Sequence, residues 1–304
     1  MKDFLARWMP IDTSEHGGAL DSMNALVHWL MAVLFVGWGL YFIYVLLRFR
    51  AKKSPRASYS GSTSQVSTWI EGGVILVEVI LLVGFAIPAW ARWVTPPSPG
   101  DNPLVVRVIA QQFAWNIHYA GADGIFGHTD IHLINEASNP IGLDRGDASA
   151  ADDIVTINQL HLPVNRPVTV LLSSKDVIHS FGLPVMRVKQ DAIPGQEIPI
   201  HFTATMTTPT EARFPGCAAD KECWEIACAQ LCGLGHYRMR GFLTIHEPDE
   251  FENWLIAEAP EPVEAEPQPA GLDASTAEAE ASDHADHADH ADHADHAEHM
   301  RAAG

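Results

Sequence analysis

Four side chains that bind soft metal ions occur within one short stretch of the chain. The segment CAQLCGLGHYRM contains two cysteines, Cys228 and Cys232, followed by His236 and Met239. Two glycines interrupt it, so we expect a loop that folds its side chains inward and not a continuous helix. Zinc takes cysteine and histidine but gains little from methionine, whereas soft sulfur, imidazole and a weak thioether favour copper. The segment therefore predicts a copper site.

The number of cysteines indicates which kind of copper site this is. A mononuclear blue-copper centre uses one cysteine, two histidines and an axial methionine. Two cysteines can instead bridge two copper ions, and a second histidine must then come from elsewhere. The stretch SSKDVIHSFGLP offers His179, at the end of a predicted strand and before a Gly/Pro turn. This ligand set leaves no open position for a substrate, so it predicts electron transfer and not hydrolysis.

The other two cysteines, Cys217 and Cys223, stand just upstream in CAADKEC. In an oxidising compartment we expect them to form a disulfide that closes a small loop. The alternative is a four-cysteine zinc site with Cys228 and Cys232, whose spacing fits zinc patterns poorly. The chain has no C-x-x-C-H motif, which excludes a covalently attached c-type haem.

Several other polar residues have weaker claims. Asp176 and Asp191, on either side of His179, are either ordinary loop acids or part of an acidic docking face for a basic protein. The remaining histidines of the predicted strands and loops lack ligand spacing, and we expect surface or hydrogen-bonded roles for them. They are His118, His128, His132, His161, His201 and His246.

Two apolar stretches must anchor the chain in a membrane. Residues 25–47 and 69–93 each exceed the roughly 20 residues that cross the hydrocarbon core as a helix. The loop between them, 48–68, carries Arg48, Arg50, Lys52, Lys53 and Arg56 and no acid, so the positive-inside rule places it in the cytoplasm. Both termini then face outward.

The second span contains two carboxylates, Glu71 and Glu78. Seven residues make almost two helical turns, so both lie on nearly one face. A charged acid in mid-membrane costs roughly 2.5–3.5 kcal/mol, which makes lipid a poor neighbour. Either both residues hydrogen-bond to a partner helix, or Glu78 stays protonated, or they form a proton entry or relay point. Both interpretations imply a partner membrane subunit.

Short strands dominate the region after the anchor. Runs of β-branched and aromatic residues recur between Gly, Pro, Asn and Asp, which predicts a β-sandwich or barrel. The polar stretch 121–158 reads as a loop insertion, and the segment from Pro248 as a short closing helix. The predicted organisation is an extracytoplasmic segment (1–24), a two-helix anchor (25–95), a β-domain (96–257) and a tail (258–304).

The tail explains the acidity of the chain. Residues 248–304 contain sixteen acids and one base, so they carry −15 of the net charge of −19, and the other 247 residues carry only −4. No basic surface for nucleic acid exists. The repeat DHADHADHADHADHAEH places six histidines in the tail, which is either a disordered solvated segment or a weak exchangeable metal binder.

Three motifs behind the two spans resemble cytochrome c oxidase subunit II of the haem–copper oxidases. They are DVIHSFGLP, VKQDAIPG and CAQLCGLGHYRMRG, and the likeness covers roughly residues 20–257. The resemblance implies two transmembrane helices as a hairpin, followed by an α+β arrangement with an extracytoplasmic cupredoxin-like β-sandwich. It also implies a binuclear copper centre, CuA, which takes electrons from cytochrome c. Haem in subunit I then receives them, reduces O2 and drives proton pumping.

Residue roles follow from the same resemblance. Cys228 and Cys232 would bridge the coppers, with His179, His236 and Met239 as further ligands. The backbone carbonyl of Gln230 would complete the shell, but its neutral side chain puts in doubt a magnesium contact that many members make with a glutamate there. The family's usual tryptophan for electron acceptance falls on Phe113, whereas Trp115 is in register. Glu71 falls where the family has a carboxylate at the mouth of a proton path.

The resemblance makes the chain one subunit of a proton-translocating oxidoreductase in a bacterial inner membrane, with the β-domain in the periplasm. Two other classes remain open on the residues alone. A membrane-anchored copper chaperone or thiol oxidoreductase would use the C-x3-C pair without needing His236 and Met239. A structural β-domain would hold its four cysteines as two disulfides.

Overall fold

The structure is a computed structural model that describes residues 9–53, 56, 59, 64–209 and 224–260. The predicted disulfide cysteines, Cys217 and Cys223, lie outside the described residues. So does nearly all of the predicted tail, from residue 261 onward.

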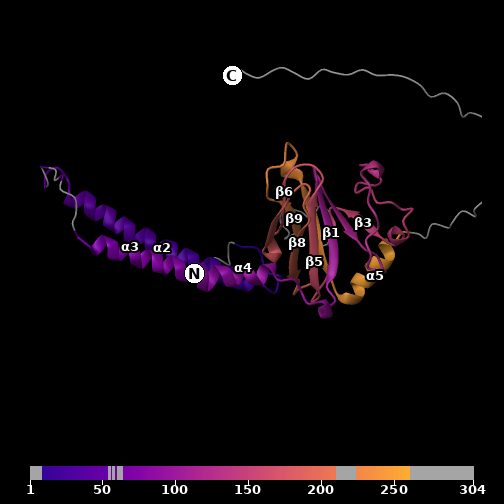
Figure 1. Cartoon of the computed structure of the whole chain (residues 1–304), viewed down its shortest axis with the longest axis horizontal. Helices are drawn as coiled ribbons and strands as arrows, with labels where there is room; N and C mark the ends of the chain where they lie inside the picture. Colours follow the sequence, from indigo (N-terminus) through magenta and orange to yellow (C-terminus); the bar gives the residue numbers. More distant parts are fainter. Residues whose placement is uncertain (1–8, 54–55, 57–58, 60–63, 210–223, 261–304) are drawn as a thin grey trace, which may run out of the picture. The chain divides into compact units, whose positions relative to one another are not determined.

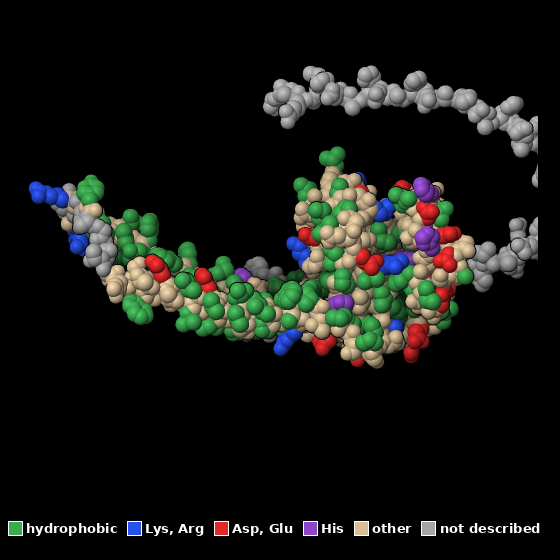
Figure 2. All heavy atoms as spheres, viewed as in Figure 1, with side chains coloured by type: hydrophobic (Ala, Val, Ile, Leu, Met, Phe, Trp, Pro, Cys, Tyr) green, Lys and Arg blue, Asp and Glu red, His purple; other side chains and the backbone are tan. Residues whose placement is uncertain are grey.

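Two long apolar helical segments precede the β-domain (Figure 1). The first is α2 (Gly17–Arg48), and the second is built from α3 (Val66–Leu81), the π-helical η1 (Leu82–Ala86) and α4 (Ile87–Val94). By length and composition, both are able to cross a membrane. Apolar side chains cover them and charged ones are rare (Figure 2).

The π-helical turn in the second segment has a local cause. Pro88 is the second residue after it and has no N–H to donate to the carbonyl of Gly84, four residues earlier. A wider i→i+5 turn is a common way for a helix to absorb such a break in its hydrogen-bond ladder. The helix therefore continues through the proline to Val94.

In the part of the chain that the structure describes, the β-domain consists of two five-stranded sheets (Figure 1). The first has the order β3-β2-β1-β5-β8, with β1 (Leu104–Gln111), β2 (Ala114–Tyr119), β3 (Ile154–Ile157), β5 (Pro167–Ser174) and β8 (Ile198–Thr203). The second has the order β4-β10-β9-β6-β7, with β4 (Gln159–Pro163), β6 (His179–Leu183), β7 (Val188–Ala192), β9 (Glu225–Cys228) and β10 (Arg240–His246).

Sequence alternation explains which face of each strand is buried. Strand β5 alternates strictly between partly exposed and buried positions, as expected where one face of a sheet packs on the core. The core also receives the aromatic side chains Trp115, Phe181 and Trp224, each at most 1% exposed. Strands β1 and β5 pair in parallel, as do β4 and β10, while the other ladders are antiparallel.

Two parts of the domain refine the expectations from sequence. The segment expected as one loop insertion, 121–158, ends in strand β3, which pairs with β2. The closing helix is α5 (Pro248–Glu258), with Phe251 buried against the domain. Short 3-10 turns lie at Pro99–Asp101, Ile131–Leu133, Ala148–Ala150, Pro184–Met186 and His236–Arg238.

Candidate metal centre

Pairing of β6 with β9 brings together two predicted ligands that are 49 positions apart in the sequence. His179 is the first residue of β6 and Cys228 is the last of β9, and the register pairs Phe181 with Cys228. The Sγ atom of Cys228 then lies 4.0 Å from Nδ1 of His179. The strand pairing alone therefore places the side chains of His179 and Cys228 next to each other.

The loop after β9 turns its other predicted ligands toward the same point. The Cys232 Sγ atom lies 3.8 Å from the Cys228 Sγ, 3.6 Å from Nδ1 of His236 and 3.7 Å from Sδ of Met239. The loop is closed where the Cys228 amide donates to the Met239 carbonyl, at 3.3 Å. Contacts of 4.0 Å or less therefore link all five predicted side chains, with the two cysteines at the centre.

The Gln230 backbone also points inward, because the Cys228 thiol donates to its carbonyl oxygen at 3.2 Å. The Gln230 residue itself is exposed. The predicted carbonyl contact is therefore possible without any contribution from its neutral amide side chain.

The donor set fits copper. Among the described residues, the ligand atoms of His179, Cys228 and Cys232 lie within 4.8 Å of one another, and both cysteines are free thiols. Burial and the neighbouring Cys228 raise the pKa of Cys232 to about 11. Two thiolates so close together therefore need a cation to compensate their charge. Soft sulfur with two imidazoles and a thioether matches the preference of copper.

His179 is fully buried and its second ring nitrogen has an acidic partner. Nε2 of His179 donates to Oδ1 of Asp176 at 2.8 Å. The backbone amide of Gln112 donates to the other oxygen of Asp176 at 2.7 Å. Burial opposes ionisation of Asp176, but these hydrogen bonds and that from Val177 outweigh it and lower the pKa of the carboxyl.

The turn between β1 and β2 packs against the loop that follows β9 and carries Cys232, His236 and Met239 (residues 229–239), called the metal loop below. The side-chain amide of Gln112 donates to the Cys232 carbonyl at 2.6 Å. A Cβ atom added at Gly235 would collide with the ring of Phe113, and one at Gly233 would lie 2.7 Å from Nε2 of Gln112. Gly233 also has φ = +131°, a conformation that favours glycine. A side chain at either glycine would therefore disturb the contact between the two loops.

The two residues predicted to accept electrons differ in exposure. Phe113 is 36% exposed, whereas Trp115 is completely buried. Trp115 makes edge-to-face contacts with His179 and Phe181, at centroid separations of 6.3 and 5.4 Å. Phe113 therefore lies at the surface beside the metal loop, whereas Trp115 lies in the core next to His179.

Among the other predicted residues, the two glutamates lie on a membrane helix, and Asp191 lies near the centre on the strand that pairs with β6. Glu71 and Glu78 are on α3, where Ser67 donates to Glu71 at 2.9 Å. Asp191 is exposed on β7, opposite Ser180. Nothing in the sequence distinguished Gln112, because its role depends on a turn meeting a loop that is 120 positions away.

The remaining histidines include a buried His–Asp pair and a partly buried pair of histidines. His118 and Asp153 are both fully buried, and Nε2 of His118 lies 2.7 Å from the Asp153 carboxylate. Nδ1 of His161 lies 2.8 Å from Nε2 of His246. Hydrogen-bonded roles were expected for His118, His161 and His246, and these contacts confirm them.

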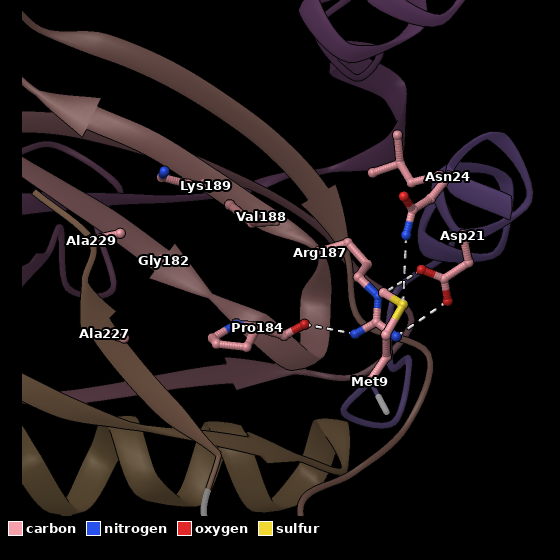
Figure 3. A pocket seen from close by; sticks show the side chains of 11 residues that line it. Met9, Asp21, Asn24, Gly182, Pro184, Arg187, Val188, Lys189, Ala227 and Ala229 are labelled. Atoms are coloured by element: carbon pink, nitrogen blue, oxygen red, sulfur yellow. Dashed lines mark hydrogen bonds and ion pairs between the residues drawn. The ribbon is translucent and has the colours of Figure 1, made fainter. Parts of the chain in front are cut away.

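A cavity of about 410 Å³ borders the end of β9 (Figure 3). Ala227 and Ala229, the neighbours of Cys228, line one wall, and Met9 lies at another. Arg187 joins the N-terminal segment to the β-domain there, with its Nε atom 2.9 Å from the Asp21 carboxylate (Figure 3). The arginine also donates to the Pro184 carbonyl at 2.7 Å.

Comparison with known proteins identifies the family. Residues 104–243 match the family described as cytochrome C oxidase subunit II, periplasmic domain. Over 250 residues the chain is 31% identical to the alternative cytochrome c oxidase subunit 2 of Bradyrhizobium diazoefficiens, with 82% of each chain covered. The chain belongs to the cytochrome c oxidase subunit II family.

Further members of the family match over shorter stretches. The cytochrome c oxidase subunit 2 of Thermostichus vulcanus is 40% identical over 172 residues, which cover 55% of this chain and 38% of that protein. The crystal structure of the periplasmic domain of subunit II from Bradyrhizobium japonicum is 26% identical, with a TM-score of 0.34 over 51% of this chain and 92% of that one.

Family membership confirms the predicted fold class. Two candidate membrane helices are followed by a two-sheet, cupredoxin-like β-domain of the periplasmic subunit II type. The chain is accordingly an electron-transfer subunit of a haem–copper oxidase complex.

Proposed function

We propose that this subunit holds a binuclear CuA centre that accepts electrons from cytochrome c. The electrons then pass to haem in subunit I, where O2 reduction is coupled to proton translocation. The observation that carries the proposal is the convergence of His179, Cys228, Cys232, His236 and Met239 on one point.

Each ligand has a distinct role in this proposal. The thiolates of Cys228 and Cys232 would hold both coppers, and Nδ1 of His179 and of His236 would each hold one of them. Met239 and the carbonyl of Gln230 would be weaker ligands. Bound copper supplies a one-electron couple. The loop would hold these groups in place: Cys232 and Met239 are only 4% and 2% exposed, although most other residues of the loop are exposed.

Electrons enter at the exposed ring of Phe113 in this proposal, and Trp115 carries the coupling inward toward His179. The packing of Phe113 against Gly235 and the contact of Trp115 with His179 support this route. An aromatic edge at the surface lets the donor approach closely without opening the metal loop.

The remaining proposals concern location and partners. The chain lies in a bacterial inner membrane, with the β-domain in the periplasm and subunit I beside the two helices. Glu71 and Glu78 contribute to a proton path at that contact. Cys217 and Cys223 form a disulfide, which a periplasmic location permits.

Copper content and the visible spectrum of the purified full-length chain in detergent test the proposal. We expect two coppers per chain and a purple mixed-valence spectrum. Reduced cytochrome c should reduce the centre, so that this spectrum disappears. Changing Cys228 to Ser removes one bridge and should abolish the purple spectrum, whereas changing the exposed Met206 to Leu should leave it unchanged. One weakly held Cu(I) per chain would support the copper chaperone instead, and no copper a structural role.

A further inference from the structure

Asp176 occupies a position between the predicted metal ligands and the predicted point of electron acceptance. One carboxylate oxygen accepts from Nε2 of His179, at 2.8 Å, and from the Val177 amide, at 2.7 Å. The other accepts from the Gln112 amide, immediately before Phe113, at 2.7 Å. A single side chain thus contacts both the histidine and the aromatic turn.

The hydrogen bond to Asp176 determines the tautomer of His179. An ionised carboxylate can only accept, so Nε2 must carry the proton and Nδ1 must present its lone pair. Nδ1 is the atom that faces the Cys228 sulfur, at 4.0 Å. Without this partner, the neutral ring could place its proton on Nδ1 and lose its ability to bind a metal there.

The second oxygen of Asp176 extends the same support to the metal loop. Gln112 donates its backbone amide to Asp176 and its side-chain amide to the Cys232 carbonyl, at 2.6 Å. Asp176 and Gln112 therefore connect three segments, the β1–β2 turn, the turn before β6 and the loop after β9.

We propose that Asp176 is a positioning residue for the copper centre, which it orients directly through His179 and indirectly through Gln112. This inference rests on the proposed function, because it assumes that His179 binds copper. It differs from the interpretation of Asp176 as one acid of a docking face, in which Asp176 and Asp191 would be equivalent.

The pair Asp176→Asn and Asp191→Asn separates these two roles in the full-length, copper-loaded chain in detergent. Each variant removes one negative charge near the centre, but Asp191 lies exposed on β7. An asparagine at 176 has one acceptor oxygen and cannot satisfy both His179 and Gln112. We expect it to release copper to a chelator about 10- to 100-fold more readily than the wild type, with an altered EPR spectrum.

Asp191→Asn should retain the wild-type chelator competition and EPR spectrum. Gln112→Leu, which keeps the backbone amide but loses the bond to the Cys232 carbonyl, should change the spectrum with a smaller loss of copper. Wild-type copper retention and spectrum in Asp176→Asn would overturn the inference. Equal changes in the two aspartate variants would also overturn it, because a docking or long-range charge effect would then suffice.

A measurement on the metal-free wild type keeps the inference testable if Asp176→Asn does not fold. Nitrogen-15 NMR of histidine-labelled chain should show His179 protonated on Nε2, with that proton protected from solvent exchange. Protonation on Nδ1 would contradict the inference. Failure of the wild type to bind a copper pair would instead contradict the proposed function, and the NMR result would still show whether Asp176 fixes the tautomer of His179.

Discussion

The environment of Gly235 shows how tightly single residues are constrained at this centre. Its missing side chain makes room for the ring of Phe113, which packs directly on the metal loop. The same ring is partly exposed and is the proposed point of electron acceptance. One glycine thus keeps the surface aromatic and the buried ligands in contact.

Changing Gly235 to Ala should therefore force either Phe113 or the loop to move. Overpacking of this kind typically costs about 1–3 kcal/mol of unfolding free energy. Urea unfolding of the full chain in detergent, followed by near-UV circular dichroism of the β-domain, measures the change. Gly100→Ala is the matched control, because no atom lies within 4 Å of a Cβ placed there. Equal stability of Gly235→Ala and the control would contradict the packing described.

Replacing Met239 tests the side chain that is expected to bind copper most weakly in the proposed ligand set. The residue is 2% exposed and its sulfur lies 3.7 Å from the Cys232 sulfur. Met239→Leu conserves volume, so unfolding free energy should fall by less than about 1.5 kcal/mol. Copper should remain bound, but the reduction potential should rise, because the oxidised centre loses a donor. Redox titration measures this, with Met206→Leu as control, and an unchanged potential would remove Met239 from the ligand set.

The individual residues of the site differ in how far they could be predicted from the sequence. The spacing of Cys228, Cys232, His236 and Met239 indicated a soft-metal loop because these ligands are close in the chain. His179 was found by its residue type and its place near a turn, but it begins β6, whereas the sequence indicated the end of a strand. Gln112 was not predictable, because its contact with Cys232 depends on how two distant turns meet in three dimensions.

At the scale of elements, the pairing of β6 with β9 positions the site, and α5 closes the opposite part of the second sheet. The ring of His161, on β4, stacks on Trp254 of α5 at a centroid distance of 4.2 Å. It also lies against His246 of β10, and the Tyr119 hydroxyl donates to the His161 carbonyl. Glu250 lies 3.8 Å from His246. This cluster links the helix to both neighbouring strands.

The cluster should make the stability of the domain depend on pH. Burial, assisted by His246, lowers the pKa of His161 to about 3, whereas an unfolded histidine has a pKa of about 6.5. Between these values the unfolded chain binds a proton that the folded chain does not. The stabilisation is therefore complete above about pH 6.5 and is lost as the pH falls, by at most about 1.4 kcal/mol per pH unit.

Replacing His161 with Gln should reduce this dependence. Urea unfolding at about pH 7.5 and about pH 5 should show a smaller loss of stability in the variant than in the wild type. The exposed His128→Gln provides the control and should behave as the wild type. Identical pH dependence in all three chains would show that His161 does not contribute.

Sequence patterns predicted the elements unevenly. Strands with clear alternation, such as β5, could be read directly, because one face of the sheet is buried. Strand β3 was concealed in a polar insertion, since its four residues are too short to show a period. The π-helical turn before Pro88 was also not foreseen, because a proline predicts a break but not how a helix absorbs it.

At the scale of the whole molecule, the membrane helices and the cationic loop between them predict on which side of the membrane the proposed copper site lies. The bases of the loop, among them Arg48, Lys52 and Lys53, predict that it remains in the cytoplasm. The β-domain then faces the compartment in which free thiols are oxidised and copper is accessible.

A topology experiment in bacterial cells tests this arrangement. With outer-membrane permeabilisation alone, protease added from outside should digest the β-domain, and a tag placed in loop 48–68 should remain protected. Replacing the loop's bases with neutral residues should weaken or reverse this orientation. A protected β-domain in the unchanged chain would contradict the predicted topology and the proposed donor.

The most direct test of the central claim is the EPR spectrum of the copper-loaded, full-length chain in its partly oxidised state. We expect one unpaired electron shared between two equivalent copper nuclei, with a hyperfine pattern that shows equal coupling to both. The pattern should be lost in Cys232→Ser, which removes one bridging sulfur. A spectrum from a single copper nucleus in the wild type would contradict the binuclear centre.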